Sequence, residues 1–158
     1  MFKLFKLTTG ILAFILVPVI ANASNINLHK TSDNYQVYLG VVPADMIKES
    51  PYLIDNDVKL HGGINNKDKS SYHVLVAIFD SKTNKRIEDA TVIAEVNKKS
   101  LLSGIEIEKP LQKMVTSGTI TYGNFFIMNQ KNTYKIEVIV YRPNQSTKET
   151  FEFTYEPY

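Results

Sequence analysis

The feature that most constrains the fold is a succession of short β-forming runs separated by turn residues, with almost no segment suited to a helix. In the first run, period-two alternation places Tyr35, Val37, Leu39 and Val41 on one face of a strand over 35–42. Further strands are predicted at 72–80, 90–96, 104–111, 118–128, 134–142 and 147–155. The last two should pair as a hairpin, and 44–49 should form one helical turn.

Regular strands without alternating helices predict an all-β fold. We expect an immunoglobulin-like antiparallel β-sandwich of about seven strands, with an eight-stranded barrel as the main alternative. Within 118–128, Gly123 is expected to break or bulge the strand, because glycine inside a strand often marks such a point. Phe125 and Ile127 are predicted to fill the core.

The N-terminus has the pattern of an export signal. Lys3 and Lys6 precede an apolar run over 10–20, and Ala21 and Ala23 follow as small residues. This order predicts a signal peptide over 1–23, because the apolar run of about 11 residues falls short of the roughly 20 that span a bilayer. Residues 24–158 are predicted to form a single β-sandwich domain with a long loop at about 50–71, located in the periplasm or secreted.

Charge and cysteine content exclude several classes of function. Lys3 and Lys6 are the only charges of the predicted signal, so the remaining chain carries 16 basic and 16 acidic residues. A neutral chain lacks the basic surface of a nucleic-acid binder, and no membrane span is expected after cleavage. The chain contains no cysteine, which excludes a disulfide, a lipoprotein anchor and a catalytic thiol.

Motifs for catalysis are missing from the sequence, so we predict that the protein is not an enzyme. There is no Gly-x-Ser-x-Gly, no phosphate-binding glycine loop and no His-Glu-x-x-His. Asp55 and Asp57 form a short acidic pair with the oxygen chemistry of a calcium ligand, but no further carboxylates follow at regular spacing. A solvated loop explains this pair equally well.

A mixed set of histidines and methionines is the strongest chemical signal. His61, His73, Met114 and Met128 are the candidate metal ligands, with Met46 in reserve. Thioether sulfur favours Cu(I), and imidazole binds both oxidation states of copper. Such a site suits an oxidising compartment, where thiolates would form disulfides.

Each candidate ligand also has a structural explanation. Met114 and Met128 adjoin strand patterns, where methionine most often fills a core. His73 lies inside a strand and is also explained as a buried, hydrogen-bonded histidine. His61 precedes two glycines and is also explained as part of a surface loop. The sequence leaves these alternatives open.

The region from Leu60 to Pro143 resembles small periplasmic proteins of the YtkA-like family. The resemblance rests mainly on the Phe-Asp-x-x-Thr-x-x-x-Ile-x-Asp-Ala-x-Val run at 79–92 and the Tyr-Gly-Asn-Phe-Phe-x-Met run at 122–128. It implies an immunoglobulin-like sandwich and a role in metal handling in the cell envelope. The N-terminal His-x-x-x-Met cluster and Met-rich tail of dedicated copper carriers are not present.

Two hypotheses of function follow. The first is a periplasmic binding protein that holds copper through His61, His73, Met114 and Met128 and passes it to, or withholds it from, an envelope protein. The second is a metal-free interaction or adhesion module that uses the 50–71 loop or an exposed edge strand.

Overall fold

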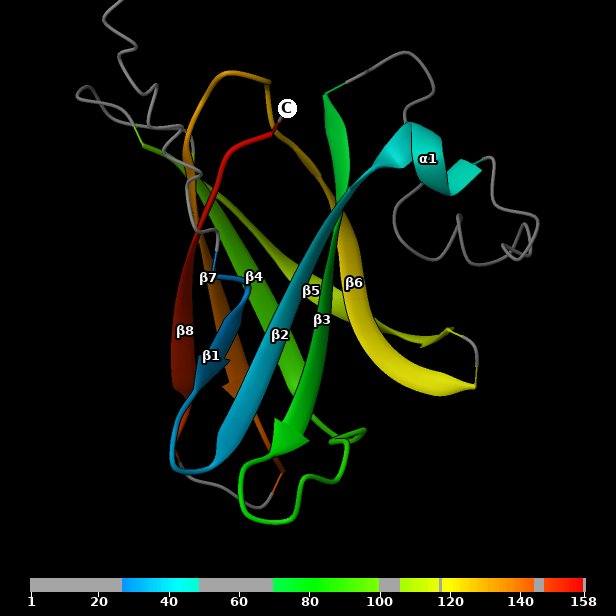
Figure 1. Ribbon diagram of the computed structural model, residues 1–158, viewed down its shortest axis with the longest axis vertical. Coiled ribbons are helices and arrows are strands. Elements are labelled where there is room, and N and C mark those ends of the chain that lie inside the picture. Colours follow the sequence, from blue (N-terminus) through cyan, green and yellow to red (C-terminus); the bar gives the residue numbers. More distant parts are fainter. Residues whose placement is uncertain (1–26, 49–69, 100–105, 117, 144–146, 158) are drawn as a thin grey trace, which may run out of the picture.

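The computed structural model describes residues 27–48, 70–99, 106–116, 118–143 and 147–157 of the chain. These residues form eight strands and one short helix (Figure 1). Their bounds are β1 (His29–Thr31), β2 (Tyr35–Pro43), α1 (Ala44–Lys48), β3 (Ser71–Asp80), β4 (Thr91–Lys98), β5 (Glu106–Thr116), β6 (Thr119–Ile127), β7 (Tyr134–Tyr141) and β8 (Glu149–Tyr155). The predicted strands, the helical turn after 43 and the hairpin of β7 and β8 are all present.

The strands form one antiparallel sheet in the order β1-β2-β3-β6-β5-β4-β7-β8. The long strand β5 belongs to both halves of this sheet. Its residues from Glu106 to Leu111 pair with β4, and those from Gln112 to Thr116 pair with β6. A strand that changes partners in this way turns a corner between two sheet halves.

The sheet curls until its two ends approach each other. At one end of the contact, the Glu149 carboxylate of β8 accepts hydrogen bonds from the Ser32 hydroxyl and, at 2.6 Å, from Asn34 Nδ2. Further along, the rings of Tyr35 and Phe151 meet edge to face at 6.4 Å between centroids. The structure is therefore nearly a barrel, and the predicted plain sandwich of about seven strands is corrected on this point.

The additional strand is β1, which lies before the first predicted strand at 35–42. Its three residues pair with β2 in the register His29↔Tyr38 to Thr31↔Gln36. The imidazole of His29 also stacks on the Tyr38 ring at 4.2 Å. Such a short polar strand has no alternation to reveal it, because its pairing depends on the neighbouring strand.

The core fills the inside of the curled sheet. In β2, the predicted alternation is confirmed, because Tyr35, Val37 and Leu39 are buried. Phe153 and Tyr155 of β8 are buried as well. The most buried aliphatic side chains of the other strands are Val74, Val76, Ile78, Val92, Ala94, Ile136, Val138 and Val140.

The prediction for β6 was wrong in two respects. The strand runs through Gly123 without a break, because Gly123 is in register with both neighbouring strands. Tyr122 and Phe126 face the core, whereas Ile127 is 42% exposed and Phe125 lies on the outer face of the sheet. Since residues on both faces of this strand are apolar, alternation alone does not determine which face is inside.

Candidate metal site

The candidate site lies on the outer face of β3, β6 and β5, which are adjacent in that order (Figure 1). Gly123 of β6 is at its centre. It pairs with Leu75 of β3 on one side and with Gln112 of β5 on the other. Directly opposed residues share a face of the sheet, so the side chains of Leu75 and Gln112 flank a position that has no side chain of its own.

His73 lies two residues before Leu75 and therefore on the same outer face. It pairs with Phe125, and the two rings stack at 4.4 Å between centroids with 23° between their planes. The His73 side chain is only 5% exposed although it faces away from the core. The stacked phenyl ring restricts the rotation of the imidazole and covers one of its faces.

Two metal-ligating atoms converge above Gly123. His73 Nε2 lies 2.8 Å and Met114 Sδ lies 3.1 Å from the position that a Cβ atom on Gly123 would occupy. The two atoms are therefore separated by no more than the sum of these distances. A Cβ atom on Gly123 does not fit there without displacing one of them. Because Gly123 has no side chain, a nitrogen donor and a sulfur donor approach each other above the strand.

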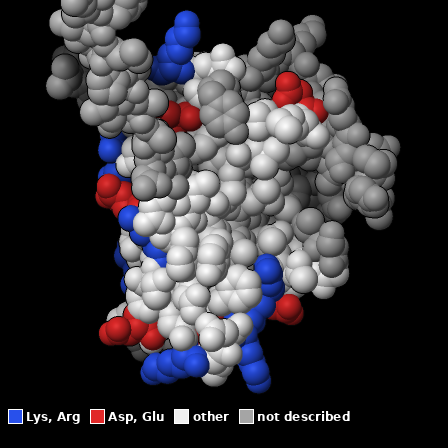
Figure 2. Space-filling model, viewed as in Figure 1, with Lys and Arg blue, Asp and Glu red and all other residues white. Residues whose placement is uncertain are grey.

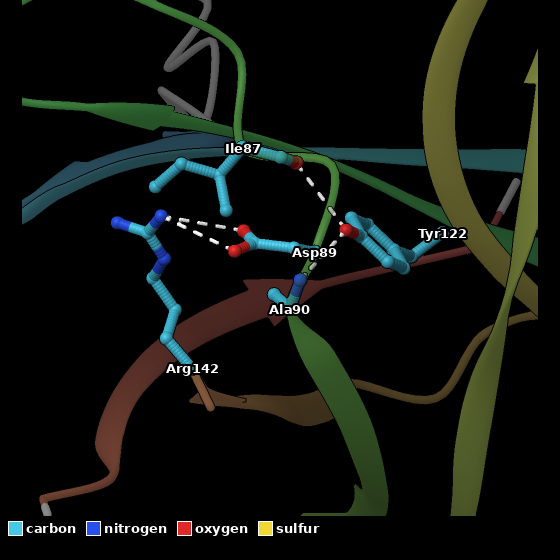
Figure 3. A network of polar contacts seen from close by, with 5 residues as sticks. All are labelled: Ile87, Asp89, Ala90, Tyr122 and Arg142. Atoms are coloured by element: carbon cyan, nitrogen blue, oxygen red, sulfur yellow. Dashed lines mark hydrogen bonds and ion pairs between the residues drawn. The ribbon is translucent and has the colours of Figure 1, made fainter. Parts of the chain in front are cut away.

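The backbone beneath the site is fixed from the core side by Tyr122 (Figure 3). Its hydroxyl accepts a hydrogen bond from the Ala90 backbone N–H at 3.1 Å and donates one to the Ile87 carbonyl at 3.3 Å. Burial raises the pKa of the Tyr122 hydroxyl above 10.0, so this group keeps its proton and its donor role at neutral pH. Tyr122 thus ties the strand next to Gly123 to the segment before β4.

An ion pair accompanies this network without adding much to it. Arg142 Nη2 lies 3.3 Å from Asp89 Oδ1, and the Asp89 side chain is 56% exposed (Figure 3). Exposed pairs of this kind contribute about 0–1 kcal/mol. The segment from Ile87 to Ala90 is therefore held mainly by Tyr122 and by the hydrogen bond from the Ile87 N–H to the Ile78 carbonyl at 2.9 Å.

A second set of contacts fixes β5 against β6. Asn124 Nδ2 donates to the Pro110 carbonyl at 2.7 Å, and Asn124 Oδ1 accepts from the Phe125 N–H at 2.8 Å. Lys109 Nζ donates to the Phe125 carbonyl at 2.7 Å. These bonds lie where β5 changes partners, and they set the position of the following residues, including Met114.

The structure brings together two of the four predicted ligands, His73 and Met114. Met128 is fully buried in the core cluster, and its backbone N–H donates to the Ser70 carbonyl. The reserve residue Met46 is 65% exposed on α1. His61, with Asp55, Asp57 and most of the 50–71 loop, lies outside the described residues.

Carboxylate or multi-histidine sites are not seen in the described part of the chain. No three side chains of His, Cys, Asp or Glu gather there in a way that would hold a metal ion. The donors available are a nitrogen and a sulfur, a combination that suits Cu(I).

Sequence reasoning missed the roles of Gly123 and Gln112. Gly123 was interpreted as a strand break, and Gln112 was not considered. The sequence does show that Gln112 and Met114, like His73 and Leu75, are two residues apart and so lie on the same face of their strand. This spacing locates a shared site only when the register between the strands is known.

Comparison by sequence finds no relatives. No protein-family model matches the chain, and no curated protein is significantly similar to it. The resemblance to YtkA-like proteins therefore stays a prediction from the sequence.

Comparison by structure does find similar proteins. A DUF4426 family protein from Pseudomonas aeruginosa PAO1 has a TM-score of 0.62 at 18% identity, over 82% of this chain and 93% of that chain. A copper-bound variant of FetP from uropathogenic Escherichia coli strain F11 has a TM-score of 0.57 at 14% identity, over 81% and 92%. Copper-reconstituted P19 from Campylobacter jejuni has a TM-score of 0.54 at 11% identity, over 83% and 93%. The likeness is one of fold.

Within the described residues, no helix is long and apolar enough to cross a lipid bilayer.

Proposed function

We propose that this protein binds copper as Cu(I) in the periplasm and holds it between His73 Nε2 and Met114 Sδ above Gly123. The observation that carries the proposal is the convergence of these two atoms on one point where a Cβ atom would not fit. The bound ion is cargo: the protein holds it for an envelope protein or withholds it from one.

The donor set supports Cu(I) over harder ions. A thioether is a soft ligand that binds Cu(I) well and binds Mg²⁺ or Ca²⁺ poorly, and imidazole suits copper in either oxidation state. Phe125 stacks on His73 and keeps the imidazole in a fixed orientation beside the sulfur. The burial of His73 limits the access of water to the nitrogen.

The fold comparison supports the same metal. Two of the structures with this fold, FetP and P19, hold copper. At 14% and 11% identity, the likeness does not extend to individual ligand residues. The residues that hold copper in this chain are therefore inferred from its own geometry. The predicted signal peptide supports the periplasmic location.

The proposal is tested by titrating the purified protein with Cu(I) against a chromophoric Cu(I) chelator under anaerobic, reducing conditions. We expect the unchanged protein to retain stoichiometric Cu(I). Met114→Leu and His73→Gln should each lose most of the affinity, because each removes one of two donors. Met128→Leu is the matched control, since it makes the same chemical change as Met114→Leu inside the core, at a cost in stability below about 1.5 kcal/mol.

If the chelator removes Cu(I) from the unchanged protein as easily as from the double variant of His73 and Met114, the site does not bind copper. A loss of binding in Met128→Leu equal to that in Met114→Leu would also contradict the assignment. It would show that packing, and not the sulfur above Gly123, controls affinity.

A second candidate function is a metal-free interaction module, and one observation favours it. Part of the outer face of β2 and β3 is formed only by uncharged residues, which are Gln36, Tyr38, Gly40, Leu75 and Ala77. Figure 2 shows this region as a white area with charged side chains at its margins. If the protein acts in this way, Tyr38→Lys should abolish binding of its envelope partner and the Met114→Leu variant should bind that partner normally.

A further inference from the structure

The third residue at the candidate site is Gln112, which lies directly opposite Gly123 on the outer face of the sheet. Its amide oxygen, Oε1, is buried and accepts no hydrogen bond from the described residues. A side-chain carbonyl has two lone pairs, and burying it without a donor is unfavourable. A buried oxygen of this kind requires an explanation.

The neighbouring buried amide shows that the fold can satisfy such a group. Asn124, one residue from Gly123, donates through Nδ2 to the Pro110 carbonyl and accepts through Oδ1 from the Phe125 N–H. Both ends of that amide are used, and it secures β5 to β6. Gln112 differs because its oxygen is buried without a hydrogen-bond donor, on the residue directly opposite Gly123.

The distances allow the oxygen to share their space. Cβ atoms of directly opposed residues are about 4.5–5.5 Å apart in an antiparallel pair. The Cβ position of Gly123 is the point near which His73 Nε2 and Met114 Sδ converge. The side chain of Gln112 extends three bonds beyond its own Cβ, which is long enough for Oε1 to reach an ion held by these two donors above the sheet.

We propose that Gln112 Oε1 is the third donor to the ion, and that it sets how well the site accepts copper in its oxidised state. This inference rests on the proposed function. Nitrogen and sulfur are sufficient for Cu(I), which accepts low coordination numbers and soft ligands. Cu(II) prefers nitrogen and oxygen donors in larger number. An amide oxygen at this position therefore strengthens Cu(II) binding while leaving Cu(I) binding almost unchanged.

The test compares the Cu(I) and Cu(II) affinities of the purified protein with those of Gln112→Leu, which removes the oxygen, and Gln112→Glu, which keeps it and adds charge. For Gln112→Leu we expect Cu(I) affinity within about threefold of the unchanged protein, and Cu(II) affinity lower by about tenfold or more. For Gln112→Glu, Cu(II) affinity should rise. Gln36→Leu, a glutamine change on the same face at β2, should alter neither.

A measurement on the unchanged protein keeps the test valid if Gln112→Leu does not fold. Because Cu(II) is paramagnetic, it broadens the NMR signals of nuclei close to it, so the side-chain amide signals of Gln112 can be followed as Cu(II) is added. They should broaden together with the His73 and Met114 signals, while those of Gln36 stay sharp. If the His73 and Met114 signals broaden and the Gln112 signals do not, Gln112 is not a ligand.

The outcomes separate this inference from the proposed function. If the unchanged protein does not bind Cu(I), the proposed function fails and this inference fails with it. If Cu(I) binds normally but Gln112→Leu leaves the Cu(II) affinity unchanged, only this inference is overturned. An equal loss of Cu(I) and Cu(II) binding in folded Gln112→Leu also overturns it, since the residue would then position the other ligands.

Discussion

Gly40 and Gly123 lie on either side of Leu75 in one row of the sheet, because Leu75 pairs with Gly40 of β2 and with Gly123 of β6. The two glycines share a face and a neighbour, but the space above them differs. A Cβ atom on Gly40 would make ordinary contact with Leu75 Cβ at 3.5 Å. A Cβ atom on Gly123 would occupy the place between His73 and Met114.

This pair gives a test of the site that changes none of the ligand residues. Gly123→Ala should lower Cu(I) affinity by about 10–100-fold, the size of effect seen for changes beside metal ligands. Gly40→Ala should leave it unchanged. Chelator competition measures the affinity, and thermal unfolding confirms that both variants fold. Equal Cu(I) affinity in the two variants would show that the space above Gly123 is not the binding site.

The second prediction concerns the anchor on the core side of the site. Tyr122→Phe removes one hydrogen bond accepted from Ala90 and one donated to Ile87, and leaves the ring in place. With about 0.5–1.5 kcal/mol for each neutral hydrogen bond, the free energy of unfolding should fall by about 1–3 kcal/mol. Urea unfolding measures this loss. A variant as stable as the unchanged protein would mean that the segment from Ile87 to Ala90 does not depend on Tyr122.

The third prediction concerns the loss of folding stability at high pH, which follows from the same hydroxyl. Burial raises the pKa of Tyr122 in the folded protein above 10.0, and burial also raises that of Tyr35. A raised folded pKa gives a contribution to stability that is fully present below pH 10 and is lost as the pH rises through the folded value. The urea midpoint should therefore fall above pH 10, and it should fall less steeply in Tyr122→Phe. The same slope in both proteins would contradict the assignment.

The fourth prediction concerns the contact between the two ends of the sheet. Glu149→Ala removes the acceptor of the bonds from Ser32 and Asn34, and hydrogen bonds to a charged group contribute about 1.5–3 kcal/mol. Partial exposure reduces this, so we expect a loss of about 1–3 kcal/mol and faster amide exchange in β1. Glu152→Ala, an exposed change on the same strand, should stay within about 0.5 kcal/mol. Similar effects of the two changes would show that Glu149 does not hold the sheet closed.

The sequence predicts those parts of the fold in which one face of a strand is apolar and the other polar. Phe151, Phe153 and Tyr155 alternate with Glu152 and Thr154 in the sequence, and all three aromatic residues are buried. In β6 the residues from Tyr122 to Phe126 offer no such contrast. Their orientation is set by pairing with β3 and β5, which are distant in the sequence or reached across a turn, so the core face was assigned incorrectly.

The candidate site shows the same limit. Residue type alone marks His73 and Met114 as candidate metal ligands, and it marks Met128 equally. What separates them is register: Met114 shares the outer face with Gly123, and Met128 follows Phe126 into the core. Register depends on tertiary pairing, so a single sequence does not determine it.

The pairing of β3 with β6 has a consequence for the order of folding. Met114 and Gly123 belong to one hairpin and meet early, but His73 joins them only when a strand about fifty residues upstream takes its place beside β6. Closing such a long loop is among the slower steps of folding. The two proposed donors are therefore together only after the strands have paired. If the proposed site binds Cu(I), the amount of Cu(I) retained measures the folded fraction of the protein.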